Sequence, residues 1–450
     1  MNEQISHLAP QTPAPAAKRR NSNPQKVIAL LSSIMALQMT SYVIILPLFA
    51  RRFSEFGAGV QALAISAMAY ALTSTLFAPF MGALTDRFGR KPLILGSLAA
   101  YIAAFCGYLL APTAGFMIVI RGLAGAFTAG LMPAVTGLAA DLAPKDRLAQ
   151  WIGFVSGGAS VGWILGPIAG GVLYDYWGYS TALIVSISMA ILTFFVALLA
   201  VPESRPAAVR PLAEVKHRER YGQHSNIRVF LVNPRSTLPS SLSTFFTLLF
   251  ISFAVMFAWA FIEPEFMFYA YNDLGWNSSM LGVAMSTYGV AMMLGVFGLG
   301  RLSDRFGRKP IIILGLMLFS AQFIGLAFFR SYILIAAAFL IAGLGNALYD
   351  PALTASILDI SPMDHRARIL GIKSMAGSMG SILGPALVVL VTSSVSTGGI
   401  FLIAVGIVLL AIVAGLAIKV EAAPSKKEPD SSVICLQTSS SQPIDEGNLL

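Results

Sequence analysis

The feature that most constrains this chain is a series of apolar stretches, each about as long as a membrane is thick. Crossing a hydrocarbon core as a helix takes roughly 20 mostly apolar residues, and stretches of that length recur along almost the whole sequence. Only 11% of the residues are charged, whereas soluble domains contain about 25%. The chain therefore belongs in a lipid bilayer, where helices satisfy their backbone hydrogen bonds internally.

The apolar stretches predict an all-α membrane protein with twelve transmembrane helices. The first stretch is too long for a cleavable signal and follows a polar, Pro-rich segment, so we expect it to stay in the membrane. The expected spans are residues 27–50, 60–82, 93–111, 115–139, 149–173, 180–201, 241–271, 280–300, 311–329, 332–358, 369–392 and 399–418.

The basic residues are distributed unevenly over the loops between these spans. If both termini are cytoplasmic, 26 of the 30 Lys and Arg residues fall on the cytoplasmic side. This excess is the positive-inside pattern of membrane proteins. It explains the net charge of +9 without a nucleic-acid partner. We expect a multi-pass protein of the cell (inner or plasma) membrane with both termini in the cytoplasm.

The two halves of the chain repeat each other at an offset of 218 residues. The segment Gly82–Pro92 returns as Gly300–Pro310, with nine identities in eleven positions. The same offset aligns Asp141 with Asp359 and several Gly and Pro residues of later segments. A repeat of this length predicts two pseudo-symmetric bundles of six helices each.

The repeat also sets the expected domain boundaries. The two six-helix bundles are expected at residues 26–201 and 240–418. Residues 202–239 are polar and hold seven basic residues, as in a cytoplasmic linker. Residues 1–25 and 419–450 have the composition of disordered cytoplasmic tails.

The repeated loop combines glycines that permit a tight turn with opposite charges on one side of the membrane. Its arginines can reach the carboxylates at the ends of neighbouring spans. We therefore expect a paired charge latch, here called the gate motif, that closes the cytoplasmic face. It comprises Gly82, Asp86, Arg87, Gly89, Arg90 and Asp141 in the first half, and Gly300, Asp304, Arg305, Gly307, Arg308 and Asp359 in the second.

Two further motifs lie inside expected spans. Arg121, followed four residues later by Gly125, is costly within a membrane unless it is paired, so it serves either a structural ion pair or the function itself. A glycine-rich motif allows close helix packing and a proline bend in the fifth span. Its residues are Gly162, Gly166, Pro167, Gly170 and Gly171.

The gate motif, the buried arginine and the glycine-rich motif together resemble the major facilitator superfamily, and the resemblance extends from the first span to the twelfth. It implies a secondary transporter whose two bundles rock about a site near the middle of the membrane. The glycine-rich motif resembles the sequence that marks exporters exchanging substrate for protons. The resemblance thus implies a drug:proton antiporter similar to tetracycline and multidrug efflux proteins.

A proton-driven exporter needs a titratable group inside the membrane, and the expected spans contain few acids. Glu263 and Glu265 flank a proline in the seventh span, and Glu263 lies deeper. Asp350 lies at nearly the same depth as Lys373, so it forms either a buried ion pair or a proton site. We expect proton coupling to involve Glu263, Asp350 or Arg121.

The remaining candidates are side chains that could line a largely apolar cavity. They are Gln38, Tyr42, Trp163, Trp259 and Asn346. All four histidines lie outside the expected spans, and the sequence has no nucleotide-binding, nucleophile or metal-binding pattern. We therefore expect neither an enzyme nor a bound metal or other cofactor.

The favoured function is alternating-access export of small hydrophobic or cationic compounds, coupled to protons. The expected partners are a small-molecule substrate, protons and the lipid bilayer, without nucleic acid, and the chain is expected to be a monomer. A metabolite symporter or facilitator of the same fold is the main alternative. A non-transporting membrane sensor is another.

Overall fold

The computed structural model describes residues 24–144, 147–203, 239, 241–299, 306–362 and 366–418. The expected tails and most of the expected linker lie outside the described residues, as do Gly300, Asp304 and Arg305 of the second gate motif.

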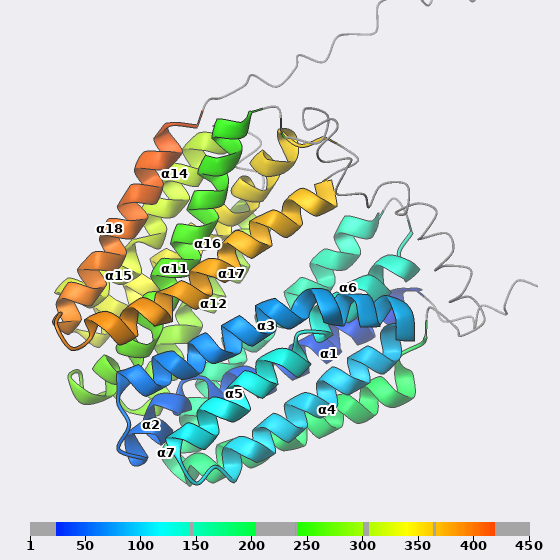
Figure 1. The fold of residues 1–450 in the computed structure, drawn as a ribbon, viewed down its shortest axis with the longest axis horizontal. Helices are drawn as coiled ribbons and strands as arrows, with labels where there is room; N and C mark the ends of the chain where they lie inside the picture. Colours follow the sequence, from blue (N-terminus) through cyan, green and yellow to red (C-terminus); the bar gives the residue numbers. More distant parts are fainter. Residues whose placement is uncertain are drawn as a thin grey trace, which may run out of the picture.

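Long helices make up both halves of the molecule (Figure 1). The first half contains α1 (Pro24–Ile45), α2 (Leu48–Glu55), α3 (Val60–Phe88), α4 (Arg90–Leu109), α5 (Ala114–Thr128), α6 (Leu131–Leu142) and α7 (Leu148–Ala200). The second half contains α11 (Leu242–Asn272), α12 (Ser278–Leu299), α14 (Arg308–Phe319), α15 (Ala321–Phe328), α16 (Tyr332–Asp359), α17 (Arg366–Val391) and α18 (Thr397–Leu416).

Eleven helices of the described residues are long and apolar enough to cross a membrane. Three of them are built from two consecutive segments, namely α1 with α2, α5 with α6, and α14 with α15. Pro47 lies at the first of these breaks, where a missing backbone N–H weakens helix continuity.

The helix α7 contains two membrane spans. Its 53 residues would reach about 80 Å if straight, far more than the roughly 30 Å hydrocarbon core. Gly178 interrupts it with φ 81° and ψ 177°, a conformation that favours glycine. Tyr179 donates to the carbonyl of Tyr108 at the end of α4, and Lys91 at its start donates to the carbonyl of Leu198. The second part of α7 therefore returns antiparallel to α4, which gives the expected twelve spans.

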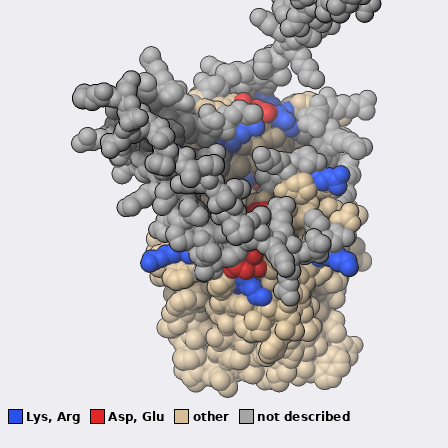
Figure 2. Space-filling model, turned by 90° about the vertical axis from the view of Figure 1, so that its right-hand side faces the viewer, with Lys and Arg blue, Asp and Glu red and all other residues tan. Residues whose placement is uncertain are grey.

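The helix ends define two faces of the molecule. We call the face with Arg90, at the start of α4, the motif face. Asp175, near the reversal of α7, lies on the opposite face and contacts Ser278 at the start of α12. The helix α12 begins at that contact and crosses the molecule to the motif face. The next helix, α14, therefore begins at Arg308 on the motif face. Figure 2 shows charged side chains of the described residues in the upper and middle part of one view, above a flank without them.

The two halves are joined at the opposite face. There α3 packs against α17 (Figure 1), and α7 packs against α12. The carboxylate of Asp175 accepts from the backbone N–H groups of Ser278 and Ser279, at 3.0 and 2.7 Å. The hydroxyl of Tyr271 donates to the carbonyl of Pro47 at 2.8 Å. These contacts link the first half to the second across the opposite face.

Candidate transport site

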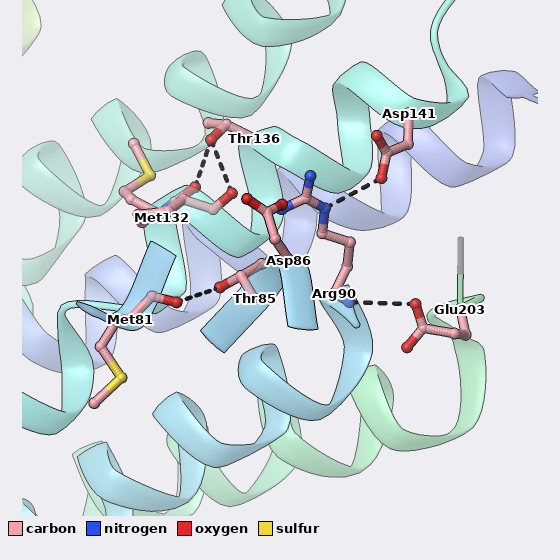
Figure 3. A network of polar contacts seen from close by, with 9 residues as sticks. Met81, Thr85, Asp86, Arg90, Met132, Thr136, Asp141 and Glu203 are labelled. Carbon is pink, nitrogen blue, oxygen red and sulfur yellow. Dashed lines mark hydrogen bonds and ion pairs between the residues drawn. The ribbon is translucent and has the colours of Figure 1, made fainter. Parts of the chain in front are cut away.

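The first gate motif is a closed ion-pair network on the motif face (Figure 3). Arg90 lies between two carboxylates, with Nη1 3.0 Å from Asp86 Oδ1 and Nε 3.1 Å from Asp141 Oδ2. The carboxylate of Glu203 accepts from the backbone N–H groups of Arg90 and Lys91 at 3.2 and 3.3 Å. A carboxylate at a helix N-terminus is stabilised by the unpaired N–H groups there. The network thus ties α3, α4, α6 and the end of α7 together.

Glycines make room for this network. Gly89 has φ 99° and separates α3 from α4, a turn that other residues rarely adopt. A Cβ on Gly137 of α6 would lie 2.7 Å from Arg90 Cζ, so this glycine lets the guanidinium pack against α6. Gly82 has open space around its Cα, and Arg87 is exposed with its guanidinium over the Phe88 ring.

The second half repeats this arrangement in its described part. Arg308 Nε lies 3.1 Å from Asp359 Oδ2, and Gly307 has φ 88°. Lys309 donates to the carbonyl of Leu416 at 2.6 Å, just as Lys91 donates to Leu198 at the same offset in the first half. Between residues that the structure describes, the ion pairs of Arg90 and Arg308 each join helices of one half.

The glycine-rich motif packs α7 against two partners. A Cβ on Gly162, Gly166 or Gly170 would meet α1, at Met39, Val43 and Ile44. A Cβ on Gly171 would instead meet the backbone of α12 at Ser278, across the halves. Pro167 lies inside α7, and its carbonyl faces Gly282 of α12. The motif therefore lets α7 touch both a helix of its own half and one of the other half.

Part of this motif recurs in the second half. Gly380 and Gly384 stand at the 218 offset from Gly162 and Gly166, and they pack on α11 in the same way. The equivalents of Gly170 and Gly171 are Val388 and Val389. Close packing within a half is thus common to both halves. At the position equivalent to Gly171, the carbonyl of Val389 accepts from Gln61 of the first half at 3.4 Å, so both positions contact the other half.

An ionisable side chain from each half lines one small cavity between the halves. Arg121 of α5 is 5% exposed, and its Cζ lies 4.3 Å from the centre of the Phe49 ring. Glu263 of α11 lines the same cavity, whose volume of about 10 Å³ accommodates one water molecule. The structure thereby brings together two of the three residues expected to couple protons.

The surroundings of Arg121 leave part of its hydrogen-bonding capacity unused. Nε and Nη1 are buried without a hydrogen-bond partner among the described residues. The Tyr70 ring lies 5.4 Å from Cζ, and such ring faces attract cations. A buried guanidinium is costly when it is only partly compensated, so it needs a nearby negative charge or water.

The other two acids lie in different environments. Glu265 is 7% exposed and accepts from the hydroxyl of Thr397 at 2.6 Å, a contact within the second half. Asp350 Oδ1 lies 2.7 Å from Lys373 Nζ, so the ion pair that their depth allowed is formed. Of the acids within the expected spans, Glu263 therefore faces the buried arginine of the other half.

A larger cavity of about 330 Å³ lies between α7 and the second half. The structure brings Trp163, Trp259 and Asn346 to its wall. Trp259 stacks on Tyr288 with ring centres 6.1 Å apart, and Asn346 Nδ2 donates to the Tyr288 hydroxyl at 2.6 Å. Such aromatic walls with few polar groups suit flat apolar molecules.

Gln38 and Tyr42 lie elsewhere on α1. Gln38 is fully buried, and its side-chain amide has no hydrogen-bond partner among the described residues. Tyr42 stacks on Tyr70 with ring centres 6.1 Å apart. Because Tyr70 also faces Arg121, Tyr42 belongs to the aromatic surroundings of that arginine.

Three residues of the site were not singled out from the sequence. Glu203 and its equivalent Glu421 also stand 218 residues apart, and this repeat was the available signal. Gly137 and Asp175 gave no such signal, because Ala355 and Ser393 stand at the equivalent positions. Their contacts with Arg90 and Ser278 depend on the tertiary structure.

The molecule has twelve spans in two repeated halves, which are joined at one face and enclose an ionisable side chain from each half. This arrangement defines a two-bundle membrane transporter. The model of the Major Facilitator Superfamily matches residues 28–271 and residues 244–436. The chain therefore belongs to this superfamily.

Several bacterial proteins are similar to this chain over most of their length. The Multidrug resistance protein MdtG of Klebsiella pneumoniae (strain 342) is 26% identical over 368 residues, which cover 80% of this chain and 85% of that protein. The Tetracycline resistance protein, class B, of Escherichia coli is 25% identical over 367 residues, covering 80% and 86%. The Multi-drug resistance efflux pump PmrA homolog of Lactococcus lactis subsp. lactis (strain IL1403) is 25% identical over 347 residues, covering 76% and 81%.

Solved structures show the same fold at lower identity. A bacterial homolog of the human lysosomal transporter Spinster, inward-facing and unoccupied, has a TM-score of 0.67 and 16% identity, covering 89% of this chain and 99% of that one. The human organic anion transporter MFSD10 (TETRAN) has a TM-score of 0.63 and 18% identity, covering 88% and 100%.

Proposed function

We propose that this transporter exports small hydrophobic compounds in exchange for protons by alternating access. The observation that carries the proposal is the small cavity shared by Arg121 of the first half and Glu263 of the second. The names of the relatives, which include multidrug and tetracycline resistance proteins, support the same function. Catalysis, a nucleic-acid partner and a second copy of the chain form no part of the proposal.

The motif face is the cytoplasmic face in this proposal, and both termini are cytoplasmic. The support is the excess of basic residues, 26 of 30, on that side of the twelve spans. The contacts at the opposite face then close the outer side. The conformation described is accordingly the one that receives substrate from the cytoplasm.

Glu263 is the proposed proton carrier. An ionised Glu263 is attracted to Arg121 in this conformation, whereas a protonated Glu263 is not. Proton loss from Glu263 is therefore coupled to closure of the outer side. Trp259, which lines the aromatic cavity, precedes Glu263 by four residues on the same face of α11. This spacing links the substrate cavity to the proton carrier through one helix.

The test measures proton movement into and out of liposomes containing the purified protein, during addition of a panel of neutral, cationic and anionic aromatic compounds. We expect substrate-dependent proton movement in the wild type and a loss of about tenfold or more in Glu263→Gln, within the 5- to 150-fold range of typical coupling free energies. Glu265→Gln is the matched control, because Glu265 contacts Thr397 and not Arg121. Absence of proton movement with every compound would contradict the proposal.

A further inference from the structure

We propose that the Asp350–Lys373 pair is the polar end of the substrate site and selects amphiphilic compounds that carry an anionic group, such as a carboxylate, on an aromatic body. The proposal rests on the proposed transport function and narrows its substrate class.

The ion pair and the aromatic cavity belong to one continuous surface. A second cavity of about 290 Å³ is lined by Asp350 and Lys373. Val255, Met256 and Tyr349 line both this cavity and the aromatic one. A ligand in the combined site would place its aromatic body among the rings and its polar end at the ion pair.

Polar side chains extend from the aromatic cavity to the second cavity. Asn346 lines the aromatic cavity and Asp350 lines the second, and the two stand four residues apart on one face of α16. Thr354, four residues further, accepts from Lys373 Nζ. The facing helix α17 adds three hydroxyl groups that can donate hydrogen bonds to a carboxylate, Ser374, Ser378 and Ser381.

Unequal burial of the two charges decides which sign of ligand the site favours. The side chain of Lys373 is 17% exposed and that of Asp350 is 52% exposed. An anionic ligand that pairs with Lys373 breaks the ion pair and leaves the carboxylate of Asp350 unpaired, but water can solvate this exposed carboxylate. A cationic ligand that pairs with Asp350 leaves the largely buried ammonium of Lys373 without a counterion, which is costly. The site therefore favours an anionic group on Lys373.

The pair is not part of the duplicated scaffold. Met132 and Val155 stand at the equivalent positions of the first half, which forms its six helices without a charge at either. A role specific to the second half explains why two charges are retained inside the membrane.

Equilibrium dialysis of the full chain in nanodiscs, without a proton gradient, tests this assignment. The probes share one aromatic body: 4-biphenylacetate, its methyl ester and 2-(4-biphenylyl)ethylamine. We expect the wild type to bind the acid most tightly. Lys373→Gln should weaken acid binding about tenfold, because a charge-assisted hydrogen bond is lost, and leave the ester unchanged. Asp350→Asn should leave acid binding equal or tighter, because it removes the competing carboxylate.

Ester binding in each variant serves as the control for folding. Equal weakening of acid and ester by Lys373→Gln would mean a purely structural pair and overturn the proposal. Tighter binding of the amine, lost in Asp350→Asn, would assign the site to cations and also overturn it. A wild type that binds none of the probes would do the same. Since no gradient is applied, these outcomes are independent of the proton-coupling test.

Discussion

The two halves of the molecule agree at the motif face and differ inside the membrane. At the motif face Arg90 pairs with Asp141, and Arg308 pairs with Asp359, at the same offset and with the same pair of atoms 3.1 Å apart. Inside the membrane the equivalent of Arg121 is Phe339, which lines the aromatic cavity. Equivalent positions of the repeat are thus occupied by a charged side chain in the first half, Arg121, and by an aromatic ring in the second, Phe339.

The acids and bases of the second half show the same divergence. The equivalent of Glu263 is Ile45, and the equivalent of Lys373 is Val155. Nearly the whole wall of the aromatic cavity comes from the second half, with α7 of the first half supplying one side. The comparison teaches that the shared loops serve the common scaffold, whereas the residues proposed for substrate binding and proton coupling lie where the two halves differ.

The largest effect is expected where the halves differ in helix packing. Gly170→Val copies the residue of the second half, Val388, into a position where Ile44 of α1 leaves no room for a side chain. We expect the free energy of unfolding to fall by about 3 kcal/mol, the upper part of the usual range for overpacking. Unfolding in mixed detergent and denaturant measures it.

Gly157→Val on the same helix is the matched control, because a Cβ on Gly157 meets nothing within 4 Å. It should change the free energy of unfolding by less than about 1 kcal/mol, because valine is no worse than glycine in helix propensity and no neighbour is displaced. If both variants lost the same stability, close packing of α7 on α1 would not explain the glycine at position 170.

The next effect concerns the charge that only the first half carries. Arg121→Met should reduce substrate-dependent proton movement by about 5- to 150-fold, the range of a coupling free energy of about 1–3 kcal/mol. Stability should fall by up to about 3–5 kcal/mol where Glu263 is ionised, because removing one partner of a buried pair leaves the other charge uncompensated, and it should recover when Glu263→Gln is added. Proton flux in liposomes and thermal unfolding check the two expectations. A variant that unfolds more easily while keeping proton coupling would assign Arg121 a structural role.

Much of the architecture could be predicted because its signals are local. The length of the apolar stretches gave twelve spans, including the two spans that meet at Gly178 within α7. The repeated motif predicted that one of its arginines reaches a carboxylate such as Asp141, and in the structure this arginine is Arg90. Depth along two adjacent helices placed Asp350 beside Lys373, because the rise per residue is fixed.

The rest depends on how helices rotate and how the halves meet. A helix that is apolar all round carries no signal for which face points to a cavity. The sequence therefore predicts Gln38 and Tyr42 on the wall of the same cavity as Trp259. In the structure neither residue lines the aromatic cavity, and Tyr42 stacks on Tyr70 instead. The shared cavity of Arg121 and Glu263 joins residues from opposite halves, so it follows from the packing of the two bundles and not from either sequence alone.

The smallest effect is expected at the two gate motifs, where the halves agree most. The side chain of Arg90 is 11% exposed beside Gly137, whereas that of Arg308 is 36% exposed and Ala355 stands at the position equivalent to Gly137. Burial strengthens an ion pair, and exposed pairs contribute little. Gly137→Ala would displace the guanidinium of Arg90 and should weaken its pairing with Asp141.

A double-mutant cycle of Gly137→Ala with Asp141→Asn, read by thermal unfolding, should therefore give a coupling energy of about 0.5–1.5 kcal/mol, as for residues that share one network. The equivalent cycle of Ala355→Gly with Asp359→Asn should give a value near zero, because the partner of Asp359 is already exposed to solvent. Equal coupling energies in the two cycles would contradict the expectation that burial strengthens the ion pair of the first gate motif. The two gate motifs would then be alike in the energy of their ion pairs as well as in sequence and geometry.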